Sequence, residues 1–291
     1  MKQILKAHFL VLIATFLVAG SFIVSQKLSG IIDPISLTLL RFVLASFFLA
    51  PIIFLNKKYR DNIATTLPRA MIISLFYSLY FIGLFKALET TTALNTGTLF
   101  TLVPLFTALV CLFIFKDKMS MRQFVIYLIG MFGTGMVVFK GDLNLFLNFS
   151  LNQGDTIFLF AIIAMVFYSV SMKFLHRKTD ELLVLVFCTL VGGCIWMFLS
   201  LLSFDIPLQW GKIQGDLIFY MLYLTIGATL FTVYLYQQAA IGIGPKKLMA
   251  YVYLNPVAIA FLLFIFEHQA IVFKVSVGIV ISTITTFLLL I

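Results

Sequence analysis

Ten long apolar segments follow one another along this chain of 291 residues, and they limit its fold more than any other feature. Breaks that contain charged residues, proline or glycine separate the segments, and no break is long enough to hold a folded domain. A helix needs about 20 apolar residues to cross about 30 Å of hydrocarbon. The expected transmembrane helices cover residues 8–27, 34–55, 69–88, 93–115, 121–140, 154–175, 182–204, 216–239, 247–266 and 270–291.

The composition excludes a water-soluble fold. Charged residues make up 11% of the chain and hydrophobic residues 62%, whereas soluble domains average about 25% charged and about 45–50% apolar residues. We therefore expect an all-α integral membrane protein whose main partner is the lipid bilayer. The net charge of +9 does not indicate nucleic-acid binding, because the basic residues lie in short loops between helices.

The distribution of basic residues predicts the orientation of the chain. If the N-terminus is inside, 14 of the 20 Lys and Arg residues lie on inner segments and five lie at outer helix ends. An excess of Lys and Arg marks the cytoplasmic side of a membrane protein. We expect both termini on the cytoplasmic side of the cell membrane, with ten crossings between them.

The chain divides into two halves of five spans each, over residues 1–142 and 143–291. A shift of 152 residues aligns Pro104 with Pro256, and each proline lies in the middle of the fourth helix of its half. We expect both prolines to bend their helices. Because five is odd, the second half enters the membrane from the opposite side, which gives the inverted repeat found in many secondary transporters.

The order and spacing of several short motifs resemble one transporter family. They are Ala19-Gly20-Ser21, Pro34 with Arg41-Phe42, Phe85-Lys86-Ala87-Leu88-Glu89, Gly154-Asp155 and Asn255-Pro256. The sequence is similar to the ten-helix EamA-type branch of the drug/metabolite transporter superfamily. This resemblance implies a central cavity lined by helices one, three, four, six, eight and nine. The chain departs from the family at Ala19, where Trp is frequent, and at Asp117, where Glu is usual.

Polar side chains on those six helices are candidates for binding a substrate in the cavity. Helix eight has a stripe of hydroxyl residues at helical spacing, which places them on one face. Serine and threonine also bond to their own helices or hold helices together, so packing is the alternative for each of them. The candidate substrate-binding residues are Ser21, Tyr77, Asn95, Thr98, Tyr168, Thr229, Thr232, Tyr236, Tyr251 and Asn255.

Arg41 is the one basic residue well inside a predicted span. It lies seven residues after Pro34, so about 10 Å along the helix at 1.5 Å per residue. A charge at that depth indicates a partner, and Glu89 and Glu267 are the carboxylates expected on the same side. We expect Arg41 to be a structural charge paired with one of these, with its side chain directed toward the outer surface, and substrate binding is the alternative role.

The sequence favours a secondary transporter over an enzyme. All eleven acidic residues lie at predicted helix ends or in loops, and an intramembrane enzyme would need acids, histidines or an activated nucleophile at matching depth. No catalytic residue, cofactor or metal site is expected. We expect export of a small neutral or zwitterionic metabolite, such as an amino acid, by alternating access. A transporter for larger or anionic solutes, nucleotide-like or drug-like, is the alternative. The further expected partners are the small-molecule substrate and a second copy of the chain in a homodimer.

Overall fold

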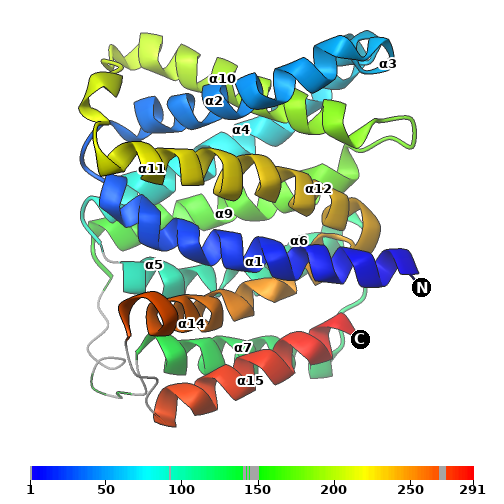
Figure 1. Cartoon of the computed structure of the whole chain (residues 1–291). Coiled ribbons are helices and arrows are strands. Elements are labelled where there is room, and N and C mark those ends of the chain that lie inside the picture. The colour runs from blue at the N-terminus through cyan, green and yellow to red at the C-terminus, as the bar shows by residue number, and fades with distance from the viewer. Residues whose placement is uncertain (1, 92, 140–141, 143, 145–150, 269–272) are drawn as a thin grey trace.

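A computed structural model describes residues 2–91, 93–139, 142, 144, 151–268 and 273–291, the side chains of residues 2–4, 6, 93, 94, 98 and 267 excepted. Throughout these residues the chain is helical, without strands. The helices run side by side in one bundle (Figure 1). The first half consists of α1 (Lys2–Leu28), α2 (Pro34–Leu55), the short α3 (Lys57–Asp61), α4 (Ile63–Leu88), α5 (Ala93–Phe100), α6 (Val103–Ile114) and α7 (Met121–Val138).

The second half contains two spans that are assembled from several helical pieces. A π-helix, η2, lies within the eighth span, and a turn of 3-10 helix, η3, lies within the ninth. The elements are α9 (Gln153–Phe174), α10 (Leu182–Phe204), η1 (Trp210–Lys212), α11 (Asp216–Leu222), η2 (Tyr223–Phe231), α12 (Thr232–Ile243), α13 (Pro245–Ala250), η3 (Tyr251–Leu254), α14 (Asn255–Glu267) and α15 (Phe273–Leu290).

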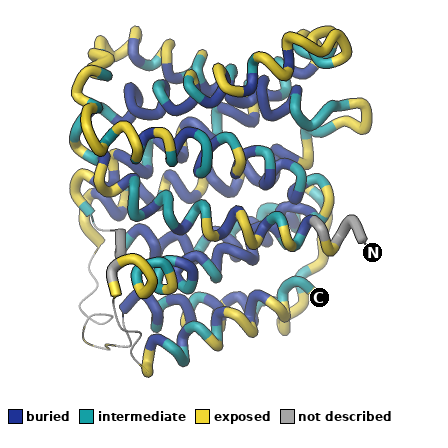
Figure 2. The backbone as a smooth tube through the Cα atoms, in the orientation of Figure 1, coloured by how far each residue is buried: buried dark blue, intermediate teal, exposed yellow. Residues whose placement is uncertain are grey.

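The described helices confirm the predicted ten-helix membrane fold. Nine of them, counting joined pieces as one, are long and apolar enough to span a membrane, and Val103–Ile114 is a shorter apolar helix. Together with α5, that shorter helix forms the fourth span. Large hydrophobic side chains are exposed around the bundle, among them Phe47 at 70% and Phe160 at 71%. The buried residues line the interior (Figure 2), so the outer surface suits lipid.

Local capping explains where several spans begin. The Asp33 side chain accepts a hydrogen bond from the backbone N–H of Ile35, and Pro34 occupies the first helical position, which needs no N–H partner. Asn152 and Asp155 form a capping box in which each side chain accepts from the backbone N–H of the other. These caps hold the ends of the second and sixth spans that lie opposite the two chain termini.

The structure corrects several predicted boundaries. The third span begins at Ile63, six residues before the predicted start, because Asn62 initiates a helix that continues through Pro68. The fourth span is interrupted between α5 and α6, and the eighth continues to Ile243. The predicted start of the last span at residue 270, and the boundary between the two halves after residue 142, lie at gaps in the described residues.

Both termini lie on the same side of the bundle, as an even number of spans requires (Figure 1). The short helix α3, which carries Lys57, Lys58 and Arg60, lies on that side as well. In the interior, α4 packs against α9 and α10, and α1 packs against α12 and α14, so helices from the two halves alternate at the centre. The helices α7 and α15 pack together at one edge (Figure 1).

Candidate functional site

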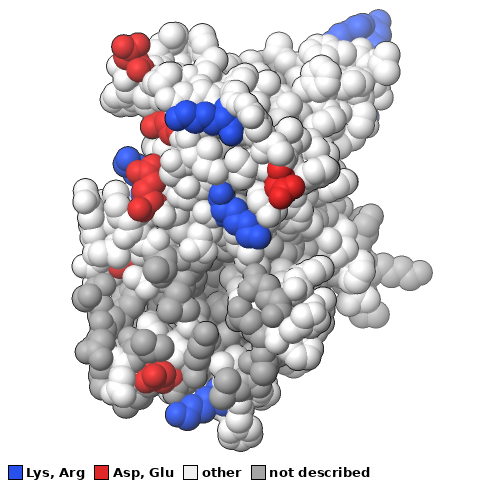
Figure 3. Space-filling view, turned by 60° about the vertical axis from the view of Figure 1, so that its left-hand side comes forward, with Lys and Arg blue, Asp and Glu red and all other residues white. Residues whose placement is uncertain are grey.

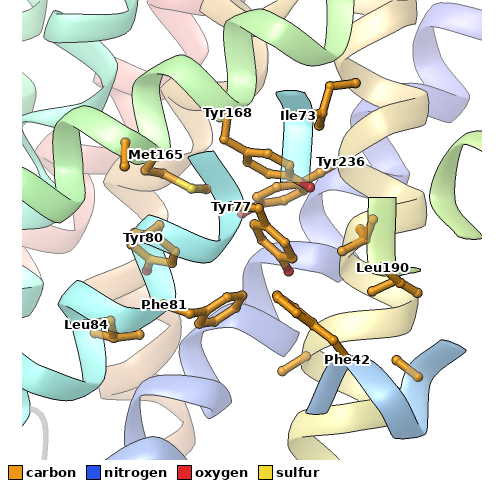
Figure 4. Packing of buried hydrophobic residues seen from close by; sticks show 14 of the residues in the cluster. Phe42, Ile73, Tyr77, Tyr80, Phe81, Leu84, Met165, Tyr168, Leu190 and Tyr236 are labelled. Atoms are coloured by element: carbon orange, nitrogen blue, oxygen red, sulfur yellow. The ribbon is translucent and has the colours of Figure 1, made fainter. Parts of the chain in front are cut away.

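A cluster of aromatic side chains lies where α2, α4, α9 and α12 meet (Figure 4). Tyr77 of α4 stacks on Tyr168 of α9, with ring centroids 4.4 Å apart and planes inclined by 22°. Phe42 of α2 stacks on Tyr77 at 5.5 Å, and Tyr236 of α12 points toward the same two tyrosines. The cluster therefore joins helices of both halves of the chain, and we call it the tyrosine cluster.

The tyrosine cluster is sealed from solvent, and its polar groups are only partly bonded. Tyr168 is fully buried, and its hydroxyl has no hydrogen-bond partner among the described residues. Thr232 lies one turn before Tyr236 and donates to the Ala228 carbonyl at 2.7 Å. A buried hydroxyl without a partner costs about 1–3 kcal/mol. The hydroxyl of Tyr168 is thus available to a water molecule or a bound solute.

Arg41 lies beside the tyrosine cluster and is fully buried. Its guanidinium donates to Thr229 Oγ1 of the eighth span, from Nε at 3.1 Å and from Nη2 at 2.7 Å. The same Nη2 is 3.3 Å from the Leu224 carbonyl and 3.5 Å from the Ala228 carbonyl. The third nitrogen, Nη1, has no partner among the described residues.

Of the two carboxylates expected to pair with Arg41, Glu89 pairs with another residue. Glu89 forms an ion pair with Lys86 at 2.7 Å, and no ion pair of the described residues includes Arg41. The side chain of Glu267, the other expected partner, lies outside the described residues. The Arg41 side chain also does not extend to the outer surface, because the eighth span offers carbonyls and a hydroxyl inside the bundle. Its charge is stabilised by these dipoles and by the face of Phe81, whose ring centroid lies 4.2 Å from Cζ.

The π-helix η2 places the acceptors that face Arg41. The Thr229 hydroxyl donates to the carbonyl of Leu224, five residues earlier, at 2.7 Å. Because that bond uses its only hydrogen, the hydroxyl oxygen presents lone pairs to Arg41. Single π turns are rare and are concentrated at functional sites. The predicted stripe of hydroxyl residues on helix eight is buried throughout, at Thr225, Thr229, Thr232 and Tyr236.

The fourth and ninth spans are both interrupted near their middles. Thr101 and Leu102 separate α5 from α6, and η3 separates α13 from α14. Pro104 and Pro256 each occupy the beginning of the helix that follows the interruption, and α6 contacts η3. Asn255, at the start of α14, is 3% exposed, and neither its amide nitrogen nor its oxygen has a partner among the described residues.

Other candidate residues have partners at other places in the bundle. The Ser21 hydroxyl donates to the Val18 carbonyl of its own helix at 2.7 Å. The Tyr251 hydroxyl lies 2.8 Å from His8 Nδ1, and the Asn95 amide donates to Asp155 at 3.1 Å. The side chain of Thr98 lies outside the described residues.

Sequence reasoning missed Gln237, which follows Tyr236 and is fully buried. Its amide nitrogen donates to Thr189 Oγ1 of α10 at 2.9 Å, while its amide oxygen has no partner among the described residues. The signal was present, because an amide inside an apolar span requires a partner. No group of three or more His, Cys, Asp or Glu side chains that could hold a metal ion occurs within the described part of the chain.

The fold and part of the sequence match known proteins. One crystal structure of another protein superposes with a TM-score of 0.73 at 18% identity, over 97% of this chain and 95% of the other. At that identity the likeness concerns the fold. No curated protein sequence gives a significant match. Residues 5–139 match the EamA-like transporter family. Residues 5–139 are therefore similar to an EamA-like transporter domain, as the motifs predicted, and the chain is a multi-pass membrane protein.

Proposed function

We propose that this transporter binds a small neutral or zwitterionic metabolite, about the size of an amino acid, at the tyrosine cluster. The observation that carries the proposal is the Tyr168 hydroxyl, fully buried and unpartnered among the described residues, at the junction of α4, α9 and α12. Binding sites for small solutes combine apolar walls with a few polar groups that fix orientation. The rings supply the walls, and the hydroxyl of Tyr168 supplies a polar contact.

Alternating access is the mechanism that we propose for this transport. Substrate sites of secondary transporters lie near the bilayer midplane, where helices are discontinuous. The interrupted fourth and ninth spans supply such helices, and α6 contacts η3 where they meet. In this proposal the halves 1–142 and 143–291 rock against each other as inverted repeats. They expose the tyrosine cluster first to the cytoplasm and then to the outside, and so export the solute across the cell membrane.

Solute exchange in proteoliposomes tests this function. The purified chain is reconstituted with an internal pool of unlabelled solute, and the uptake of labelled amino acids, nucleosides, sugars and nucleotides is followed. We expect an amino-acid-sized solute to exchange faster than in protein-free liposomes. If no solute in the panel does so, the proposal is wrong. Exchange of nucleotides alone would favour the alternative of a larger, anionic cargo.

A variant of Asn255 locates the solute along the ninth span. In Asn255→Ala the amide, which has no partner among the described residues, is removed. We expect a higher KM for exchange because a contact available to the solute is lost. Asn62→Ala is the matched control, since Asn62 bonds to the Lys58 carbonyl in the surface segment next to α3. Combining Asn255→Ala with Tyr251→Phe extends the test to the next turn. Unchanged kinetics with normal insertion would exclude these two side chains from the site.

A further inference from the structure

Arg41 carries a charge that the described structure does not neutralise. It is fully buried, and none of the ion pairs among the described residues includes it. The fully buried acid Asp155 accepts hydrogen bonds from Thr91, Asn95 and the Asn152 N–H, which are remote in sequence from Arg41. An ionised side chain inside a membrane is costly and is normally paired. Because no carboxylate of the described residues pairs with Arg41, a ligand that carries a negative charge would neutralise it.

The geometry leaves one side of the guanidinium free for that ligand. The Thr229 hydroxyl accepts hydrogen bonds from Nε and Nη2. Nη2 also donates to the carbonyls of Leu224 and Ala228 in η2. Both hydrogens of Nη1 remain without partners among the described residues. Because Thr229 itself is fixed by its bond to the Leu224 carbonyl, the direction of Nη1 is set before any ligand arrives.

Phe81 lies between the Arg41 guanidinium and the tyrosine cluster. The Phe81 ring lies 4.2 Å from Arg41 Cζ on one hand and packs edge-on against Tyr77, at 4.7 Å between centroids, on the other. Phe81 is itself buried. Only the Phe81 ring thus separates the Arg41 guanidinium from Tyr77, which a small molecule in the cluster would contact. No charged side chain of the described residues forms an ion pair with Arg41.

We propose that Arg41 Nη1 binds the carboxylate of the transported solute, so that the transporter selects solutes that carry a carboxylate. The proposal rests on the function proposed above and names the chemical group that it recognises. Hydrogen bonds between a guanidinium and a carboxylate are charge-assisted and are about twice as strong as neutral ones. Arg41, Thr229 and the carbonyls of η2 form the anchoring unit, and the tyrosine cluster contacts the rest of the molecule.

The test compares amino acids with their amides, which have the same size but lack the carboxylate. Phenylalanine, leucine and threonine and their three amides are added to the purified full-length chain in detergent, and thermal unfolding is followed. The same compounds then compete for exchange in proteoliposomes. For at least one pair we expect the acid to bind at least about tenfold more tightly than the amide, since a hydrogen bond to a charged group contributes about 1.5–3 kcal/mol. Equal effects of acid and amide in every pair would overturn the proposal.

Substitution of Arg41 gives the second readout. In Arg41→Gln we expect the ratio of acid to amide affinity to fall toward one, whereas Arg41→Lys retains part of it. Arg69→Gln is the matched control, because Arg69 is paired with Asp180, and it should leave the ratio unchanged. A folded Arg41→Gln variant with the ratio of the unsubstituted protein would contradict the proposal. If that variant does not insert, the comparison of acids and amides on the unsubstituted chain decides alone.

Two further outcomes separate this inference from the proposed function. Thermal unfolding is also measured in sodium chloride and in sodium sulfate at equal ionic strength. If chloride stabilises the protein in a way that depends on Arg41, and amino acids add no further stability, the site holds an inorganic anion and the proposal is wrong. If amides exchange as fast as acids, the transport function stands and the carboxylate anchor fails. If no solute exchanges, the proposed function fails, while the unfolding measurements still decide whether Arg41 binds carboxylates.

Discussion

Tyr77 of α4 and Tyr168 of α9 stack with their ring centroids 4.4 Å apart, although 91 positions separate them in the sequence. This contact joins the third span of the first half to the first span of the second half. It lies at the centre of the tyrosine cluster, with Phe42 on the other face of Tyr77 (Figure 4).

Removing only the hydroxyl of Tyr168 tests its role in binding. In Tyr168→Phe the stacked ring remains, so we expect the melting temperature to stay the same or rise slightly, because a buried unpartnered hydroxyl is lost. The KM for exchange should rise about three- to tenfold, which is the contribution of one neutral hydrogen bond. Tyr253→Phe is the control: its hydroxyl donates to the Tyr127 carbonyl at 2.9 Å, so we expect about 1 kcal/mol lower stability with unchanged KM. An unchanged KM in Tyr168→Phe together with a raised KM in Tyr253→Phe would place the solute elsewhere.

Gly193 of α10 leaves room for Phe42, and a larger residue there should disturb the cluster. A Cβ atom at Gly193 would lie 2.5 Å from Cδ2 and 2.6 Å from Cε2 of Phe42. Because Phe42 is buried between α10 and Tyr77, its ring has no free space into which to move. We expect Gly193→Ala to lower the free energy of unfolding by about 1–3 kcal/mol and to slow exchange. Gly135→Ala is the control, since nothing lies within 4 Å of a Cβ there; equal effects of the two substitutions would contradict this packing.

The ion pair between Arg69 and Asp180 predicts a loss of stability in acid. Burial alone would raise the pKa of Asp180, but hydrogen bonds from the Arg69 side chain and the Arg177 N–H lower it below its ordinary value. A lowered folded-state pKa contributes stability that is present above about pH 4 and is lost as the pH falls through the folded value. Burial lowers the pKa of nearby His176, so its protonation adds to the loss.

Thermal unfolding in detergent at neutral and acidic pH measures this effect. At neutral pH we expect Asp180→Asn to be less stable than the unsubstituted chain by about 1–3 kcal/mol, because hydrogen bonds to a charged group are lost. The difference should shrink as the pH falls toward 3. A difference that stays constant with pH would show that the carboxylate charge is not involved.

Labelling of introduced cysteines tests the predicted orientation. Lys57 lies in α3, on the side of the termini, and Lys212 lies in η1, after the seventh span. With a membrane-impermeant reagent on intact cells, Lys212→Cys should be labelled, while Lys57→Cys should react only after the membrane is opened. The native Cys111 and Cys188 are buried, so their background is low. Labelling of Lys57→Cys on intact cells would invert the proposed topology.

Charged residues on the outer face of the bundle do not form one patch. Figure 3 shows acidic and basic side chains interspersed on one face of the molecule, with wide neutral areas between them. The charge of +9 is thus not concentrated on this view of the molecule.

Hydropathy was sufficient to predict the spans, because lipid requires each crossing to be a long apolar helix. It did not predict the interruption after Phe100 or the π-helix in the eighth span, since both preserve the apolar composition. The π-helix bonds to Arg41, whose partners Leu224 and Thr229 are 183 and 188 positions away. The rule that pairs buried charges with carboxylates did not predict the carbonyls of Leu224 and Ala228 as partners of Arg41, because backbone carbonyls carry no signature in the sequence.

The site was predicted in part for a similar reason. Tyr77, Tyr168 and Tyr236 were singled out as polar groups inside lipid, and the structure brings these three together. Phe42 and Phe81 look like ordinary lipid-facing or packing residues in the sequence, and only their ring contacts with Tyr77 distinguish them. Sequence spacing defines the face of one helix, whereas the meeting of four helices depends on tertiary packing.

The π-helix η2 also affects how this chain should be compared with its relatives. A π turn holds one residue more than an α turn, and each residue of an α-helix advances by about 100° around the axis. A relative with a regular α-helix here would match Tyr236 only if a one-residue gap were placed between Tyr223 and Phe231. Alignments that forbid gaps inside membrane spans would therefore shift every position of α12 by one and pair the cluster-facing residues with lipid-facing ones.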